Sequence, residues 1–379
     1  MNYTIVEYVW IGGPNANHPQ HEKQINYIKP FSLRSKARIL YDILKDNIQL
    51  SDIPNWNFDG SSTGQATTEN SEIYIVPRTI FNDPFRDNGI MVLCDTYIDY
   101  KCTIPHQTNT RYRANEIFNS KLDEEPWFGI EQEFFVMQKH NTCEYVSIGS
   151  GDKRCDTCKG GKPPSFDLFK EQGQYYCAVG SNNIMVRSLI EDIAKKCLKA
   201  NVKLSGWNAE VAPSQWEFQI GPLTGITASD HLWMLRYIME RCTEETSFYI
   251  ELHPKPIVNS LNVNGSGAHT NYSTKKMRDP NMDPLNASLT LYSAIEKLSA
   301  KHTQHIDQYG DFNDMRLIGS CETSSMDKFT YGIASRAASV RIPREVSQIG
   351  YGYFEDRRPS SIMDPYKVTS LIFETTCLN

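Results

Sequence analysis

The sequence predicts an α+β protein with a small β-rich domain followed by a larger mixed domain. Three observations support this prediction. The chain has 379 residues, more than one domain of ~150 residues requires. Short β-rich runs occupy residues 1–105, whereas strand and helix patterns alternate through residues 106–379. Neither a GxGxxG nor a GxxxxGK[ST] phosphate loop occurs in the sequence, which disfavours a Rossmann or P-loop enzyme.

The first region contains three runs with strand composition. They are rich in Ile, Val and Tyr, are broken by Gly, Pro, Asn and Asp, and cover residues 4–11, 71–78 and 88–99. Residues 15–29 are polar and lack a periodic pattern, so we expect a loop there.

The second region mixes helix and strand signals. Residues 111–122 have a helical pattern, and a strong strand follows at 124–137. Residues 141–174 are rich in Gly, Lys and Pro and predict a surface loop. Helical spacing returns at 184–198, 231–242 and 287–302, and the last two follow a Ser, Asp or Asn able to cap a helix. Residues 208–221 form two strand-like halves around Pro213 and Ser214, which predicts a hairpin.

Composition and charge exclude several classes of protein. A net charge of −6 provides no basic field for nucleic acid. No run approaches the ~20 apolar residues that span a bilayer, and the first residues lack the pattern of a signal peptide. The ten cysteines show no disulfide-framework spacing, which suits a reducing compartment. We therefore expect a cytoplasmic protein with no nucleic-acid or membrane partner.

Glutamates occur repeatedly where strands should be apolar. Glu131 and Glu133 lie two apart, so both leave one face of a strand while their apolar neighbours leave the other. One such pair usually marks a solvated face. The pattern recurs, however, with Glu210 and Glu217 in the predicted hairpin and with Glu355 after two aromatic residues. Because isolated buried carboxylates are very costly, this set predicts bound cations.

His269 lies in the glycine-containing stretch NGSGAHTN, where the backbone can approach a ligand closely. A lone histidine is more often a hydrogen-bonded structural residue. Together with the glutamates it gives an oxygen-rich ligand set with one imidazole and no thiolate, which favours Mg²⁺ or Mn²⁺ over zinc. More than four ligands predict two or more metal sites.

Six arginines are concentrated in the C-terminal part of the chain: Arg316, Arg336, Arg341, Arg344, Arg357 and Arg358. Arginine runs are normally solvated, yet Arg341 lies between two β-branched apolar residues and just before a proline, which excludes a charged helix. Guanidinium groups bind carboxylate and phosphate in two-point geometry. Metals and arginines without a Walker loop predict phosphoryl transfer to or from a small carboxylate.

The stretch WNFDGSS at 56–62 raises a separate question. Asp59 and Gly60 are a strong turn pair, and adjacent serines can bond the local backbone. A turn does not explain the aromatic residues Trp56 and Phe58.

Taken together, six motifs closely resemble glutamine synthetase of the eukaryotic type: WNFDGSSTGQA, WFGIEQE, NAEVAPSQWEFQIGP, NGSGAHTNYSTKKMR, ASRAASVRIPR and GYFEDRRPSS. They follow the motif order of that family from about Val6 to the C-terminus. The resemblance implies a β-grasp domain over 1–105 and a catalytic domain over 106–379 whose curved antiparallel sheet is flanked by helices. It also implies a homo-oligomer, a decamer of two pentameric rings with active sites between neighbouring subunits.

The resemblance further implies the reaction. The γ-carboxylate of L-glutamate attacks the γ-phosphate of ATP, and ammonia displaces phosphate from γ-glutamyl phosphate to give glutamine. Asp59 would bind ammonium and take its proton in the adjacent subunit's site, with Trp56 and Phe58 near that boundary. Glu322 would lie on a flap that shields the acyl phosphate from water, and Arg336 would contact the transferring phosphoryl group.

The remaining roles are also implied by the resemblance. Two or three Mg²⁺ or Mn²⁺ ions per site would be held by Glu131, Glu133, Glu210, Glu217, His269 and Glu355. Glutamate would be held by Asn264, Gly265, Arg316 and Arg357. ATP would be bound by Trp127, Asn271, Ser273, Arg278, Arg336, Arg341 and Tyr353.

The chain departs from the family pattern at several positions. Cys321 precedes Glu322 where the family usually has histidine, and Met315, Ser335 and Val263 replace a common Arg, Asn and Trp. The N-terminal arm common in the family is nearly absent, which bears on ring assembly. Residues 155–158 form a CxxC with Cys143 upstream, either a zinc site or incidental thiols in a loop.

Two other functions stay open at this point. A related ligase could join glutamate to a larger amine, and an inactive relative could serve as a structural assembly. The first would need an open amine site in place of a small anionic cage. The second should have lost glutamates or arginines from the metal and phosphate positions, and all of these are present.

Overall fold

The computed structural model describes residues 2–14, 31–138, 175–181, 183–256 and 263–378. The chain divides into two compact units. The N-terminal unit comprises Met1–Glu116, Ile193–Val202 and Trp233–Ile238, and the C-terminal unit comprises Ile117–Asp192, Lys203–Leu232 and Met239–Asn379. The predicted loops at 15–29 and 141–174 and the CxxC at 155–158 lie outside the described residues. The predicted boundary between residues 105 and 106 stays a prediction.

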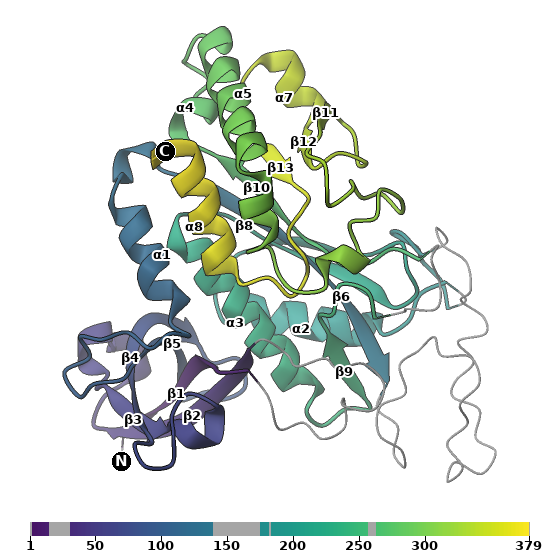
Figure 1. The fold of residues 1–379 in the computed structure, drawn as a ribbon. Helices are drawn as coiled ribbons and strands as arrows, with labels where there is room; N and C mark the ends of the chain where they lie inside the picture. Colours follow the sequence, from purple (N-terminus) through teal and green to yellow (C-terminus); the bar gives the residue numbers. More distant parts are fainter. Residues whose placement is uncertain (1, 15–30, 139–174, 182, 257–262, 379) are drawn as a thin grey trace. The chain divides into compact units, whose positions relative to one another are not determined.

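The N-terminal unit is built on a five-stranded mixed sheet of order β2-β1-β5-β4-β3 (Figure 1). The strands are β1 (Tyr3–Gly12), β2 (Ser32–Tyr41), β3 (Trp56–Asp59), β4 (Glu72–Asn82) and β5 (Gly89–Tyr97). β1 pairs in parallel with β5 and antiparallel with β2, the arrangement of a β-grasp domain. The three predicted strands are confirmed. The two edge strands were not predicted: β2 has half-buried or exposed side chains, and β3 is short and contains the Asp59 of the predicted turn.

The aromatic residues of WNFDGSS belong to the core of this unit. Phe58 is buried and packs on Trp10 with ring centres 4.4 Å apart, while Trp56 makes an edge contact with Tyr8 at 5.4 Å. The ammonium group of Lys36 lies 3.7 Å from the centre of the Trp56 ring. Within the chain, Trp56 and Phe58 therefore act as packing residues that fix the strand leading to Asp59.

The C-terminal unit is built on a curved sheet of order β11-β12-β13-β10-β6-β8-β7, with β9 paired to β6. Its strands are β6 (Trp127–Gln138), β7 (Leu204–Ala209), β8 (Gln215–Thr224), β9 (Phe248–Glu251), β10 (Ala268–Ser273), β11 (Tyr331–Ile333), β12 (Val340–Ile342) and β13 (Phe354–Asp356). All pairs are antiparallel except β11 with β12. The predicted α+β class with a curved antiparallel sheet is confirmed.

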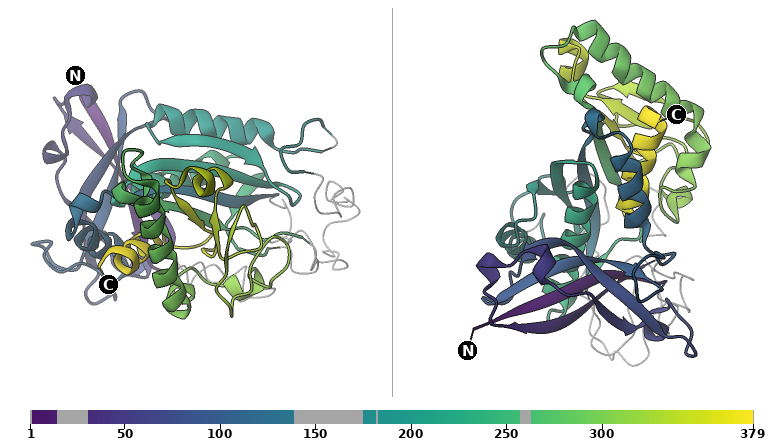
Figure 2. Two further views of the ribbon diagram at one scale, coloured as in Figure 1. Left: turned by 90° about the horizontal axis from the view of Figure 1, so that it is seen from above. Right: turned by 90° about the vertical axis from the view of Figure 1, so that its left-hand side faces the viewer.

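The helices are α1 (Thr110–Asn119), α2 (Arg187–Lys199), α3 (Ile226–Thr243), α4 (Lys275–Arg278), α5 (Pro284–Ala300), α6 (His302–Ile306), α7 (Arg344–Ile349) and α8 (Pro365–Phe373). α5 and α8 lie side by side in both views of Figure 2, and Lys297 of α5 donates to the carbonyl of Thr376 just beyond α8. Among the described residues, no helix combines the length and apolar character needed to cross a bilayer.

Two predicted helix starts are wrong. α3 begins at Ile226, and Asp230 is not a cap but lies inside the helix, buried, where it accepts a hydrogen bond of 2.6 Å from the Tyr366 hydroxyl. α5 begins at Pro284 rather than after Asn286. Asp283 caps it by accepting from the Leu285 amide, and proline at the first helical position already has a helical φ.

Candidate active site

The predicted metal ligands meet on one face of the curved sheet. His269 of β10 faces Glu131 of β6 in the register of the sheet, and Glu133 of β6 faces Glu217 of β8. Glu210 directly follows β7, in the turn of the predicted hairpin rather than inside a strand. The alternation of β6 sends Glu131 and Glu133 to this face, while Ile130 and Phe134, on the opposite face, are buried in the core.

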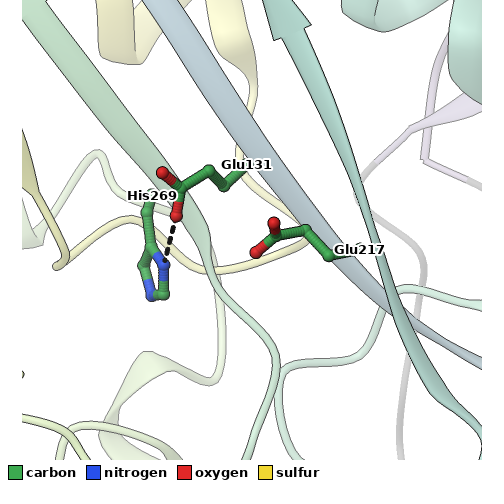
Figure 3. A group of neighbouring side chains, drawn as sticks. All are labelled: Glu131, Glu217 and His269. Atoms are coloured by element: carbon green, nitrogen blue, oxygen red, sulfur yellow. Dashed lines mark hydrogen bonds and ion pairs between the residues drawn. The ribbon is translucent and has the colours of Figure 1, made fainter. Parts of the chain in front are cut away.

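Two groups of three residues have ligand atoms within 4.8 Å of one another. One group is Glu131, Glu217 and His269, drawn in Figure 3, and the other is Glu133, Glu210 and Glu217. Figure 3 shows the contact between Glu131 and His269, with the carboxylate of Glu217 pointing toward both. Glu217 belongs to both groups, so the geometry gives two adjacent groups that could each hold a cation and that share one carboxylate.

Burial makes this cluster electrostatically unfavourable without a cation. It raises the pKa of Glu133 to about 8, with a further contribution from Glu210. Burial likewise raises the pKa of Glu210 to about 8, with Glu217 adding to it. The pKa of Glu217 also rises to about 8, through burial and then through the charges of Glu131 and Glu133. Oxygen donors that need a positive charge fit a hard divalent cation such as Mg²⁺ or Mn²⁺.

His269 is oriented by partners on both ring nitrogens. Arg316 donates to Nε2 at 3.0 Å, so Nδ1 carries the proton of the neutral ring and donates to Glu131 at 3.3 Å. Burial, and then the charge of Arg357, lower the pKa of His269 well below its usual range. A cation bound at Nδ1 would move that proton to Nε2, and Arg316 would keep its bonds to the carbonyls of Arg357 and Arg358.

Glu355 differs from the other glutamates because arginines neutralise it. Its side chain is fully buried and accepts from Arg341 and, at 2.6 Å, from Arg357. Its Oε1 also lies 3.5 Å from Nδ1 of His269. Arg341 reaches it from the neighbouring strand β12, where the two residues are register partners. Glu355 is the one member of the predicted metal set that joins neither group of three.

The predicted glutamate-binding residues gather beside Glu322. The Asn264 side chain donates to the Glu322 carboxylate at 3.3 Å, and Arg357 donates to the Glu322 carbonyl at 3.3 Å. Arg336 contacts the same carboxylate at 3.4 Å. A side chain at Gly265 would meet the Pro254 carbonyl oxygen at 2.4 Å, so only glycine fits there. Arg316, buried, completes this group.

A cleft of about 530 Å³ lies at one end of the same sheet face. Five of the predicted ATP-binding residues line it: Trp127, Asn271, Ser273, Arg278 and Tyr353. The guanidinium of Arg278 stacks on the Trp127 ring at 4.0 Å, which leaves a flat aromatic wall. Glu131 lines the cleft and accepts from Asn271 at 2.9 Å, so the cleft opens onto the carboxylate cluster. Arg336 and Arg341 do not line it.

Asp59 lies in the N-terminal unit, at the exposed end of β3. Its carboxylate accepts from the Ser61 amide at 3.0 Å and from the hydroxyls of Ser61 and Ser62 at 2.6 and 2.8 Å. These side-chain hydrogen bonds lower the pKa of Asp59. A side chain at Gly60 would meet Ile73 at 2.5 Å. The sequence DGSS thus builds a tight turn that presents an ionised carboxylate to solvent.

Sequence reasoning missed the residues that support the glutamates. Gln219 lines the cleft and donates to Glu217 at 2.8 Å, and Asn208 donates to Glu210 at 2.9 Å. Alternate residues of a strand share a face, so the pattern that indicated Glu217 in β8 could also have indicated Gln219. Gly129 also lines the cleft, next to Asn271 on the neighbouring strand. No local sequence pattern identifies it, because its position in the cleft depends on that strand pairing.

Comparisons with known proteins agree with this geometry. Residues 109–376 match the family model of the glutamine synthetase catalytic domain. A putative glutamine synthetase of Acanthamoeba polyphaga mimivirus is 45% identical over 99% of this chain and 94% of its own length. A cytosolic isozyme of rice, Oryza sativa subsp. japonica, matches equally in identity and coverage. A chloroplastic glutamine synthetase of Brassica napus is 45% identical over 99% of this chain and 78% of its own length.

A curved sheet with clustered glutamates, flanking arginines and a nucleotide-sized cleft defines an ATP-dependent carboxylate–amine ligase. The match spans both units and far exceeds what one shared motif would give. The chain belongs to the glutamine synthetase family.

Proposed function

We propose that the protein joins L-glutamate to ammonia at the expense of ATP, giving glutamine, ADP and phosphate. This proposal rests on one observation: the two groups of three residues that share Glu217 lie between the cleft and the arginines around Glu322. Family membership supports the reaction. The geometry supports the order of its parts: nucleotide at one end, cations in the middle and glutamate at the other end.

The cations proposed here are Mg²⁺ or Mn²⁺. Glu131, Glu217 and His269 would hold one, and Glu133, Glu210 and Glu217 a second. Glu355, the sixth predicted ligand, lies near enough to His269 to join the first or to hold a third. When bound, these ions neutralise the phosphate oxygens and polarise the γ-phosphate for attack.

ATP and glutamate are bound by separate sets of residues. We propose that the ATP base lies against Trp127 and Tyr353 in the cleft, with Asn271, Ser273 and Arg278 along the sugar and phosphates. Arg341 and Arg336 contact the phosphates at the inner end. Asn264, Gly265, Arg316 and Arg357 bind glutamate, since two arginines there match an amino acid that carries two carboxylates.

The reaction takes two steps. An oxygen of the glutamate γ-carboxylate attacks the γ-phosphorus, the bond to the ADP oxygen breaks, and γ-glutamyl phosphate forms. Arg336 spreads the charge of the transferring phosphoryl group. Ammonia then attacks the γ-carbonyl carbon, and the carbon–oxygen bond to phosphate breaks.

Asp59 supplies the ammonia. Its ionised carboxylate, stabilised by Ser61 and Ser62, attracts ammonium and accepts one proton from it. Glu322 completes the anionic cage, and the segment that carries it keeps water from the acyl phosphate.

We also propose an assembly and a location. Asp59 acts in the site of the adjacent subunit of a homo-oligomer, as two pentameric rings would arrange it. Sedimentation analysis tests the assembly, because a monomer would leave the Asp59 assignment without support. The cytosolic isozymes among the relatives support a cytoplasmic location, although a chloroplastic relative matches equally well.

Omission of single substrates tests the reaction. Phosphate release and glutamine are measured with ATP and Mg²⁺, leaving out glutamate or ammonium in turn. The proposal predicts that glutamine forms only when both are present. Phosphate release with glutamate and a polyamine, but not with ammonium, would reassign the enzyme to a ligase for larger amines. No release in any mixture would indicate an inactive assembly.

A further inference from the structure

The charged residues of β13 and of the two positions after it lie on two opposite faces. Glu355 and Arg357 point to the site, whereas Asp356 and Arg358 point away and are fully buried. Arg358 donates to both oxygens of Asp356, at 2.9 and 2.6 Å, and Asp356 also accepts from the Tyr309 hydroxyl at 2.7 Å. This buried pair therefore fixes the strand behind the substrate-binding residues.

His302, at the start of α6, extends this network. Nη1 of Arg358 donates to its Nδ1 at 3.0 Å, and its Nε2 lies 2.8 Å from the carbonyl oxygen of Met326. An arginine only donates and a carbonyl only accepts, so the two contacts require a neutral ring with its proton on Nε2. Burial lowers the pKa of His302, which favours this neutral form.

The segment that His302 reaches is the one that carries Glu322. We call residues 320–328 the Glu322 segment. Its backbone is strained, because Cys321 and Glu322 are consecutive non-glycine residues with φ of 54° and 60°. Two left-handed residues persist only where surrounding contacts hold them. Close to the strained pair, the Thr323 hydroxyl donates to the Arg316 carbonyl at 3.0 Å.

Two further contacts hold the far end of the segment. The Met326 amide donates to the Leu317 carbonyl at 2.9 Å, which leaves the Met326 carbonyl facing His302. The Ser339 hydroxyl lies 3.2 Å from the hydroxyl of Ser324. Arg357 also donates directly to the Glu322 carbonyl at 3.3 Å, whereas the contact of His302 leads from the segment to the buried pair behind β13.

We propose that His302 is a positioning residue that ties the Glu322 segment to the buried pair of Asp356 and Arg358, in addition to the direct bond from Arg357 to the Glu322 carbonyl. Its imidazole accepts a hydrogen bond from Arg358 at Nδ1 and donates one from Nε2 to the Met326 carbonyl, so the ring links the two residues. The inference rests on the proposed function, in which this segment shields γ-glutamyl phosphate.

The tie has a chemical consequence. When the segment opens too early, water attacks the γ-carbonyl carbon and the carbon–oxygen bond to phosphate breaks. Glutamate and phosphate are then released, so ATP is consumed without glutamine. Loss of the tie should therefore raise the rate of phosphate release with glutamate present and ammonium absent. A change that merely reduced the amount of folded protein would lower all rates together.

Replacing His302 by asparagine or by glutamine distinguishes its hydrogen bond with Arg358 from its hydrogen bond with Met326. In His302→Asn the side-chain oxygen can accept from Arg358, but the side chain is too short to reach Met326 as well. In His302→Gln the amide nitrogen reaches toward Met326. His305→Asn is the control, because His305 lies on the same helix and contacts Tyr309 and Thr375 but not the segment.

The ammonium-free phosphate release is expressed relative to the complete reaction of the same variant. We expect this fraction to rise about two- to tenfold in His302→Asn, the range that one lost hydrogen bond corresponds to. It should stay at the wild-type value in His302→Gln and in His305→Asn. An unchanged fraction in folded His302→Asn overturns the inference.

Two further outcomes are also decisive. Should His302→Asn not accumulate as folded protein, His302→Gln decides alone, and a raised fraction in that variant overturns the inference because the donor to Met326 is retained. A wild-type enzyme that releases no glutamate-dependent phosphate overturns the proposed function itself, which the variants would not do.

Discussion

His269 of β10 and Glu131 of β6 face each other across the sheet, with Nδ1 of the imidazole 3.3 Å from a carboxylate oxygen. The strand pairing fixes this relationship, so the two proposed ligands lie together without a bound cation. Glu217 reaches the same place from β8. The proposed cation site is thus built on three neighbouring strands.

Glu217→Gln should nearly abolish activity, because Glu217 is the carboxylate common to both proposed cation sites. We expect a loss of kcat of about 100-fold or more, typical for removing a major electrostatic contribution. The thermal stabilisation that Mn²⁺ gives the wild type should also shrink. Glu296→Gln, an exposed position on α5, is the control. Wild-type stabilisation by Mn²⁺ in Glu217→Gln would argue against the shared ligand.

The cation-free protein should lose stability as the pH rises. Glu133, Glu210 and Glu217 have pKa values raised from 4.5 to about 8, so the folded state binds more protons than the unfolded state between these values. The contribution of these three groups to the free energy of unfolding is complete below pH 4.5 and is lost as the pH rises through 8. Between these values the free energy of unfolding falls by roughly 1.4 kcal/mol per pH unit for each extra proton that the folded state binds.

Denaturant unfolding with a chelator at pH 6, 7 and 8 measures this decline. Saturating Mn²⁺ should stabilise the protein more at pH 8 than at pH 6, because binding no longer has to displace protons. A chelated protein whose stability is flat or rises over this range would contradict the buried cluster.

Gly129→Leu should weaken ATP binding. A β-carbon at Gly129 lies 3.6 Å from both Asn271 and the Ile220 carbonyl, so Gly129→Ala fits and serves as the control. The longer leucine side chain would enter the cleft. We expect KM for ATP to rise about tenfold or more, with KM for glutamate unchanged. Equal effects on both substrates would show that the cleft is not the nucleotide site.

Asp59→Ala should impair the use of ammonium. The ionised carboxylate is the group proposed to attract ammonium and to take its proton, so KM for ammonium should rise at least about tenfold. The KM values for ATP and glutamate should change little. Asp46→Ala, an exposed aspartate in the same unit, is the control. Equal loss for all three substrates would remove Asp59 from this role.

Asp356→Asn should destabilise the fold, because it leaves Arg358 charged and fully buried. Breaking one partner of a buried pair costs about 3–5 kcal/mol. The control is Glu244→Gln, whose partner Arg241 is partly exposed, and it should cost less than ~1 kcal/mol. Denaturant unfolding compares the two. Similar small losses would mean that the buried pair adds little to stability.

Much of the catalytic sheet could be predicted from local patterns. Alternation in β6 identified the face that carries Glu131 and Glu133, and the residues around Arg341 excluded a charged helix there. The sequence could not show that Glu355 is neutralised by Arg341 and Arg357, since that depends on which strands are neighbours.

The misses have physical causes. The start of α3 was wrong because Asp230 resembles a helix cap in sequence, whereas tertiary contact with Tyr366 makes it a core residue. Gln219 contacts Glu217, two residues away in the chain, whereas His302 contacts Met326, which is 24 residues away. Only the first of these could have been read from a periodic pattern.

The transfer of oxygen from glutamate to phosphate tests the proposed reaction most directly. Glutamate labelled with ¹⁸O in its γ-carboxylate is incubated with enzyme, ATP, ammonium and Mg²⁺, and the released phosphate is analysed by mass spectrometry. Attack of the carboxylate on the γ-phosphorus predicts one labelled oxygen in each phosphate and one in each glutamine. Unlabelled phosphate formed together with glutamine would contradict the γ-glutamyl phosphate intermediate.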